Sequence, residues 1–137
     1  KKIEIDFLPS AKPLNIIAEP VSLENVVINN LITNAIKFSN QNSKIRFEIS
    51  ENSEFYIFKI EDYGIGMPRE MVPRLFSFEA STSRVGTSGE PGTGFGMPLL
   101  KTYVELFGGK IEVSSRCISE FPNSHGTTFE LFFKKAA

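Results

Sequence analysis

Five segments alternate apolar and polar residues with a period of two, the pattern of β-strands that are buried on one face. A strand of this kind needs hydrogen-bonding neighbours and a covering layer, so the set restricts the chain to folds built on one largely antiparallel sheet. The five segments are KIEIDFL (2–8), SKIRFEIS (43–50), EFYIFKIED (54–62), GKIEVSS (109–115) and TTFELFF (127–133).

Two further segments have helical spacing. In SLENVVINNLITNAIKFS (22–39) apolar residues recur every three or four positions, and Ser22 is the expected N-cap. A second helix is predicted over 97–107, with Pro98 in its first turn and Gly108-Gly109 at its end. A short helix is expected around 69–75. The fold class is therefore α/β: a two-layer sandwich with a mixed, mostly antiparallel sheet of about five strands, covered on one face by about three helices.

Length and composition restrict the number of domains, the partners and the cellular location that can be expected. A length of 137 residues fits one domain, 1–137, and the chain opens on Lys1 without an initiator Met, which suggests a piece of a longer protein. The net charge is −1 with scattered basic residues, so neither nucleic acid nor direct membrane contact is expected. A single cysteine, Cys117, excludes an internal disulfide and favours a cytoplasmic location.

The first predicted helix carries polar residues on one face. Asn30, Asn34 and Lys37 stand at i, i+4 and i+7 in an otherwise apolar segment. Asparagine oxygens are suitable ligands for Mg²⁺, and a lysine one turn on could reach a phosphate. The alternative is a solvent-facing stripe on a surface helix.

Next comes a strand that ends in a carboxylate and two glycines. The segment KIEDYGIGMP places Asp62 at the strand end, followed by Gly64 and Gly66. A carboxylate there could accept a hydrogen bond from the exocyclic amine of adenine, and glycines would let a flat base approach the backbone. The alternative is an ordinary Asp-Gly turn.

The stretch GTSGEPGTGFGMP (86–98) is rich in glycine. Gly92, Gly94 and Gly96 have G-x-G-x-G spacing and lead into the second predicted helix, whose N-terminus would favour an anion. A dinucleotide fingerprint and a P-loop are both excluded, because the required third-glycine spacing and the Gly-Lys-Ser/Thr sequence are missing. A flexible linker or a simple helix entry remains the alternative.

Taken together, and in their order along the chain, five motifs resemble those of the catalytic ATP-binding domain of sensor histidine kinases, which has the Bergerat fold. The resemblance extends over residues 3–134. The motifs are NLITNAIKF (30–38), DYGIGM (62–67), LFSFEA (75–80), GTSGEPGTGFGMPL (86–99) and HGTTFELFF (125–133), which look like the N box, the G1 box, the F box, the lid with the G2 box, and the final Gly-Thr strand.

The resemblance implies site residues for ATP and Mg²⁺. On the first helix it implies Asn34 as the Mg²⁺ ligand, Asn30 facing the phosphates, Lys37 as a phosphate contact and Phe38 as an aromatic wall. On the base side it implies Asp62 as the acceptor for adenine N6, Gly64 and Gly66 beside the base, and Thr127 as a support for Asp62. On the phosphate side it implies backbone contacts from Gly92, Gly94, Phe95, Gly96 and Met97.

Residues 77–96 resemble the family's mobile ATP lid, in which Arg84 either reaches the γ-phosphate or is a solvated loop residue. Three departures stand out. Phe95 and Met97 replace the more common Leu, and residues 117–124 make an unusually long connection, which puts the local hairpin in doubt. His125, the only histidine, is interpreted as a loop residue and not as the phosphoacceptor.

The resemblance therefore implies a histidine kinase activity of which this chain supplies half. ATP would donate its γ-phosphoryl group to a histidine on a separate dimerisation domain of the same protein, with a response regulator receiver domain as the later partner. Hydrolysis should be slow, because hydrolysing relatives have Glu where Asn30 stands. Alternatives are a nucleotide-responsive binding module, with exposed Phe76 and Phe78 as docking residues, and a degenerate domain that binds no nucleotide.

Overall fold

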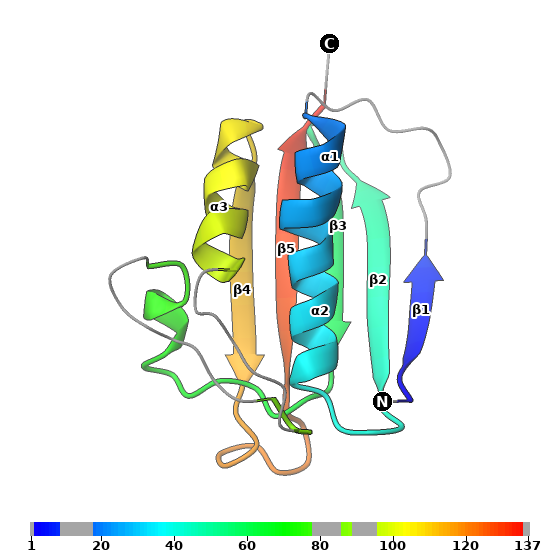
Figure 1. The fold of residues 1–137 in the computed structure, drawn as a ribbon, viewed down its shortest axis with the longest axis vertical. Helices are drawn as coiled ribbons and strands as arrows, with labels where there is room; N and C mark the ends of the chain where they lie inside the picture. The colour runs from blue at the N-terminus through cyan, green and yellow to red at the C-terminus, as the bar shows by residue number, and fades with distance from the viewer. Residues whose placement is uncertain (1, 9–17, 78–85, 89–95, 136–137) are drawn as a thin grey trace.

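The computed structural model describes residues 2–8, 18–77, 86–88 and 96–135. A five-stranded sheet forms one layer of the fold, with strand order β1-β2-β3-β5-β4 (Figure 1). β1 runs parallel to β2, and the other neighbouring strands are antiparallel. All five predicted strands are confirmed, as β1 (Glu4–Leu8), β2 (Lys44–Glu51), β3 (Phe55–Asp62), β4 (Lys110–Arg116) and β5 (Gly126–Lys134).

The first predicted helix is formed by three consecutive elements: α1 (Pro20–Ser22), the π-helical turn η1 (Leu23–Ile28) and α2 (Asn29–Lys37). The prediction of Ser22 as N-cap was wrong. Glu19 is the N-cap, and its carboxylate accepts hydrogen bonds from the backbone N–H groups of Val21 and Ser22 at 3.1 and 2.7 Å. The helix begins earlier because Pro20 is suited to a first helical position, where no backbone donor is needed.

The second predicted helix is α3 (Gly96–Leu106), with Pro98 in its first turn. The helix stops before Gly108, whose φ of 74° lies in the left-handed region. The N–H groups of Gly108 and Gly109 then donate to the carbonyls of Glu105 and Val104 at 3.0 and 2.9 Å, the arrangement of a Schellman motif. The predicted Gly-Gly stop is therefore confirmed.

The predicted helix at 69–75 is shorter than expected. Only the 3₁₀ turn η2 (Val72–Arg74) forms, held by i to i−3 bonds such as Leu75 N–H to the Val72 carbonyl at 3.2 Å. Pro73 has no N–H to donate to a carbonyl four residues earlier, which disfavours a longer α-helix here.

The helices cover one face of the sheet, as predicted, and the core lies between the layers (Figure 1). In β3 every second side chain is buried, from Tyr56 to Asp62, and the intervening ones are half-exposed on the open face. No helix among the described residues is long and apolar enough to cross a membrane. The core includes Val27, Leu31, Ala35, Ile45, Phe58, Ile60, Leu100, Val104, Phe129, Leu131 and Phe133.

Candidate functional site

The site is built where β3 ends and β5 begins, on the face of the sheet that the helices cover. Asp62 is the last residue of β3, and its side chain is buried on the helix-covered face, with 5% exposed. Its Oδ1 accepts a hydrogen bond from the N–H of Gly64 at 2.9 Å. Thr127, which is 7% exposed, stands directly opposite Asp62 in the antiparallel pair. The fold therefore brings together two of the predicted site residues that are 65 positions apart in sequence.

The two glycines after Asp62 are required by the protein's own backbone. A Cβ on Gly64 would lie 2.1 Å from the carbonyl oxygen of Phe38, and a Cβ on Gly66 would lie 2.0 Å from that of Arg116. Gly66 also has a φ of 67°. From the sequence, these glycines were expected to allow the close approach of a base, whereas the described contacts are with the end of α2 and the end of β4.

Several hydrogen bonds fix the turn after Asp62. The N–H of Ile65 donates to the Phe38 carbonyl at 3.0 Å, and the N–H of Met67 donates to Ser115 Oγ at 2.8 Å. Ser115 Oγ also lies 2.8 Å from Thr127 Oγ1. Ser115 was missed in the sequence, where its position at the end of an alternating strand was the only available signal. It links the turn to the final strand.

Asn30 and Asn34 stand one turn apart on α2, and both are half-buried. Asn30 Nδ2 donates to the Val26 carbonyl at 2.5 Å, which turns its oxygen toward the start of α3. A Cβ on Gly96 would lie 3.3 Å from Asn30 Oδ1, so the first residue of α3 packs beside this amide. Within the described part of the chain, the side chain of Asn34 has no hydrogen-bond partner.

Lys37 and Phe38 end the same helix. The Lys37 ammonium lies 5.0 Å from the centroid of the Phe38 ring, and Phe38 is buried. Thr87 contacts this end of α2: its N–H donates to the Lys37 carbonyl at 3.0 Å, and its hydroxyl donates to the Ser39 carbonyl at 2.5 Å. Thr87, which belongs to the predicted lid, was not singled out from the sequence.

The remaining predictions meet different outcomes. Phe76 is half-buried and packs against the core, so its prediction as an exposed docking residue was wrong; Leu75 before it is buried and anchors the segment. Met97 is buried at the start of α3, with 8% exposed. Most of the predicted lid lies outside the described residues, including Phe78, Arg84, Gly92, Gly94 and Phe95.

The long connection after β4 does not disrupt the hairpin. β4 and β5 pair from Lys110 opposite Phe132 to Arg116 opposite Gly126. The connection is fastened to the turn after Asp62, because the N–H of Ile118 donates to the Ile65 carbonyl at 2.8 Å.

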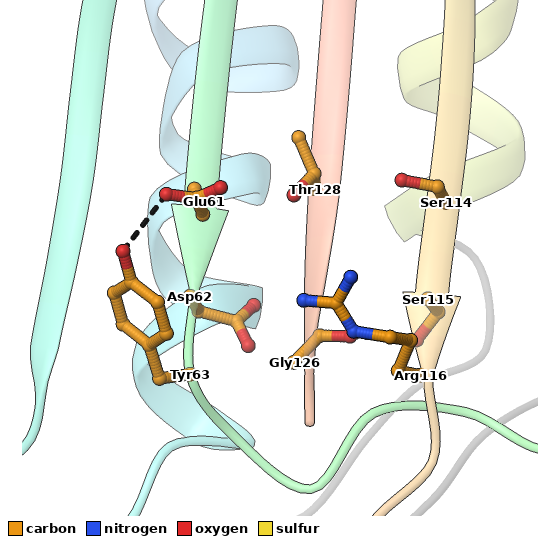
Figure 2. A pocket seen from close by; sticks show the side chains of 8 residues that line it. All are labelled: Glu61, Asp62, Tyr63, Ser114, Ser115, Arg116, Gly126 and Thr128. Atoms are coloured by element: carbon orange, nitrogen blue, oxygen red, sulfur yellow. Dashed lines mark hydrogen bonds between the residues drawn. The ribbon is translucent and has the colours of Figure 1, made fainter. Parts of the chain in front are cut away.

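A polar hollow of about 80 Å³ lies at the ends of β3, β5 and β4 (Figure 2). The pKa of Tyr63 is raised there, because its hydroxyl donates to Glu61 at 2.9 Å and because the phenol is partly buried. The hollow is smaller than the roughly 300 Å³ of a small-molecule site. Most of its lining comes from the open face of the sheet, so it is distinct from the covered end of β3. It is lined by Glu61, Asp62, Tyr63, Ser114, Ser115, Arg116, Gly126 and Thr128.

Comparisons with known proteins identify the family and match the fold. The sequence profile of the family described as histidine kinase-, DNA gyrase B- and HSP90-like ATPase matches residues 20–137. The chain is 34% identical over 108 residues to the hybrid signal transduction histidine kinase C of Dictyostelium discoideum, an alignment that covers 75% of this chain and 9% of that protein.

Two solved structures share the fold. The catalytic domain of histidine kinase ThkA matches with a TM-score of 0.76 and 25% identity, covering 97% of this chain and 79% of that one. Full-length ShkA in complex with AMPPNP matches with a TM-score of 0.71 and 23% identity, covering 98% of this chain and 26% of that one.

The family profile accounts for most of the chain, from α1 to its end. The chain spans only 9% to 26% of the length of curated relatives such as histidine kinase C and the Staphylococcus aureus kinase ArlS. The chain belongs to the family of histidine kinase-, DNA gyrase B- and HSP90-like ATPases, and its relatives within that family are histidine kinases.

Proposed function

We propose that this chain binds ATP with Mg²⁺ and donates the γ-phosphoryl group to a histidine on a separate dimerisation domain of the same protein. One observation carries the proposal: four motifs that are distant in sequence contact one another, and the N–H of Ile65 in the turn after Asp62 donates to the Phe38 carbonyl at the end of α2. Asp62 lies opposite Thr127, and Asn30 lies beside Gly96 at the start of α3. The similarity to full-length ShkA, whose structure is a complex with the ATP analogue AMPPNP, supports a nucleotide as the ligand.

Adenine recognition is assigned to the end of β3. The Asp62 carboxylate is buried, so a hydrogen bond from the adenine amine would form away from competing water. Guanine has an acceptor in place of that amine, and a buried carboxylate facing it would be repelled, which costs about 1–3 kcal/mol or more. Gly64 and Gly66 form the turn beside the base, and Thr127 supports the carboxylate from the neighbouring strand.

The phosphates are assigned to the facing end of α2 and the start of α3. Asn34 carries a half-buried amide oxygen without a described hydrogen-bond partner, which fits a Mg²⁺ ligand, with Asn30 one turn earlier. When bound, Mg²⁺ would neutralise charge on the phosphate oxygens. Lys37 supplies a positive charge, and Phe38 forms the aromatic wall. Backbone contacts to the phosphates come from Gly96 and Met97, together with Gly92, Gly94 and Phe95 outside the described residues.

The chemical step is displacement at phosphorus. The bond from the γ-phosphorus to its bridging oxygen breaks, a bond to an imidazole nitrogen forms, and ADP leaves. The imidazole is itself a nucleophile, so the chain mainly positions ATP and neutralises charge. Asn30 occupies the position of the hydrolytic Glu of related ATPases, and an amide cannot take a proton from water. A response regulator receiver domain would accept the phosphoryl group next.

The test uses ATP that carries radioactive phosphorus at the γ position. The chain is incubated with it alone, and in a polypeptide that also contains its own dimerisation helices. Label on a histidine of those helices, with slow phosphate release from the isolated chain, is the expected result. Fast hydrolysis that needs no acceptor would contradict the kinase assignment. Nucleotide binding with neither label nor hydrolysis would favour a nucleotide-responsive binding module.

A further inference from the structure

His125 stands immediately before β5, opposite the turn that follows Asp62. The pairing of β3 with β5 ends with Asp62 opposite Thr127, so Gly64 lies two residues after the last pair and His125 lies two residues before it. His125 is half-buried, and the strand that follows it buries Thr127 and Phe129 on the helix-covered face.

The imidazole contacts the backbone of the turn directly. Its Nδ1 lies 2.5 Å from the carbonyl oxygen of Gly64. A carbonyl oxygen only accepts hydrogen bonds, so Nδ1 carries the proton and donates. Next to this contact β5 comes so close to β3 that a Cβ on Gly126 would lie 2.2 Å from the Asp62 carbonyl oxygen.

With this hydrogen bond, both polar groups of one peptide unit have a partner. The peptide that joins Gly64 to Ile65 is held at its carbonyl by His125 and at its N–H by the Phe38 carbonyl. The other polar group of Gly64, its N–H, donates to the Asp62 carboxylate. Glycine has the least restricted backbone of all residues, so the orientation of this unit depends on its hydrogen-bond partners. The position of the Asp62 carboxylate depends on it in turn.

We propose that His125 is a positioning residue for base recognition: it orients the Gly64 peptide and thereby holds the Asp62 carboxylate in place for the adenine amine. This inference rests on the proposed function, because it assumes that Asp62 receives that amine. The Asp62 carboxylate can accept about four hydrogen bonds in all, and the N–H of Gly64 supplies one of them. His125 touches neither the nucleotide nor the phosphates in this role.

Three variants separate the hydrogen bond from other contributions of the ring. His125→Ala removes the donor. His125→Asn restores it, because the Asn amide nitrogen occupies nearly the place of Nδ1 in the imidazole. His125→Gln carries its amide one bond further out, near the place of Nε2, and serves as the matched control. All three are compared with the unchanged chain by thermal unfolding without nucleotide.

The readout is the ratio between the dissociation constants for purine riboside triphosphate, which lacks the 6-amino group, and for ATP. The unchanged chain should bind ATP about tenfold or more tightly than the analogue. His125→Ala and His125→Gln should lose affinity for ATP by roughly fivefold to tenfold, with little change for the analogue, because one positioning hydrogen bond is lost. His125→Asn should recover most of the ratio.

Two results would overturn the inference. The first is an affinity for ATP that is unchanged in the Ala variant; the second is an equal loss of affinity for ATP and for the analogue, which would indicate a general structural role. Failure of the unchanged chain to bind ATP would overturn the proposed function itself. A nitrogen NMR spectrum of the nucleotide-free chain adds an independent check, since the neutral His125 should carry its proton on Nδ1, and a proton on Nε2 would contradict the contact.

Discussion

Asp62 and Thr127 are directly opposite residues at the ends of β3 and β5, and both side chains are buried on the helix-covered face of the sheet. Ser115 joins them from β4, with its Oγ 2.8 Å from Thr127 Oγ1 and 2.8 Å from the N–H of Met67. Three adjacent strands therefore converge on one turn. A rigid strand end holds a binding group more accurately than a loop does. A substitution of Asp62 is therefore the most direct test of the proposed site.

The first prediction concerns Asp62→Asn. The Asn oxygen can still accept from the N–H of Gly64, so the turn and the melting temperature should change little. The new amide group is a donor where adenine also presents a donor, so the dissociation constant for ATP should rise about tenfold to a hundredfold. Titration calorimetry with ATP measures this change.

Glu61→Gln is the matched control. Glu61 is the neighbouring carboxylate on β3, but it alternates to the open face of the sheet. Its neutralisation should leave ATP affinity unchanged. Equal losses in the two variants would point to a long-range charge effect, and unchanged affinity in Asp62→Asn would contradict the assignment of base recognition.

The second prediction compares two glycines with similar backbone angles. At Gly108, with a φ of 74°, no atom of the described residues other than its chain neighbours lies within 4 Å of the position that an added Cβ would occupy. Gly66 has a φ of 67° and the Arg116 carbonyl oxygen 2.0 Å from that position. Gly108→Ala should lower the free energy of unfolding by about 1–2 kcal/mol, the cost of left-handed backbone alone. Gly66→Ala should lower the free energy of unfolding by clearly more, because the backbone must also move away from the Arg116 carbonyl oxygen. Denaturant unfolding of both variants distinguishes the two contributions, and equal costs would contradict the close approach.

The sequence was sufficient for most of the fold, because the signals were local. Strict alternation marks strands such as β3 and β5 whatever their neighbours are, and Gly108-Gly109 ends α3 through its own hydrogen bonds. Local reasoning was insufficient at the start of the first helix. Both Glu19 and Ser22 are polar residues near that end, and only the backbone path shows that the Glu19 side chain reaches the free N–H groups.

The site was less predictable, because its contacts join distant residues. Asp62 and Asn30 stand out by residue type and spacing, but Ser115 and His125 act through partners that are 48 and 61 positions away. Nothing in their local sequence specifies those partners. The glycines illustrate a related limit, since the pattern indicates that Gly64 must be small but not that the neighbouring group is the Phe38 carbonyl.

The third prediction concerns Glu19 and pH. The pKa of Glu19 is lowered, chiefly by a hydrogen bond with the Ser22 side chain and then by the N–H groups of Ser22 and Val21. A lowered pKa in the folded state means that the stabilisation is present above the ordinary pKa of 4.5 and is lost as the pH falls through the folded value. Glu19→Ala should melt at a lower temperature than the unchanged chain near neutral pH, and the difference should shrink in acid.

Thermal unfolding, followed by circular dichroism from neutral pH to about pH 3, measures the difference in melting temperature between Glu19→Ala and the unchanged chain at each pH. Glu24→Ala is a suitable comparison, because Glu24 is an exposed carboxylate in the following turn, η1, and is not the N-cap. A difference for Glu19→Ala that stays constant across the whole range would show that the charge of Glu19 does not stabilise the helix start.

The last prediction concerns Thr87, which joins the predicted lid to the end of α2. Its hydroxyl donates to the Ser39 carbonyl, and its N–H donates to the Lys37 carbonyl. Thr87→Val keeps the shape and the N–H but leaves the Ser39 carbonyl without this donor, so the free energy of unfolding should fall by about 1 kcal/mol. Thr87→Ser keeps the hydroxyl, so its free energy of unfolding should fall by less. Hydrogen exchange adds a local readout: the amides that end α2 should lose protection in the Val variant, and a loss spread evenly over the sheet would argue against a local anchor.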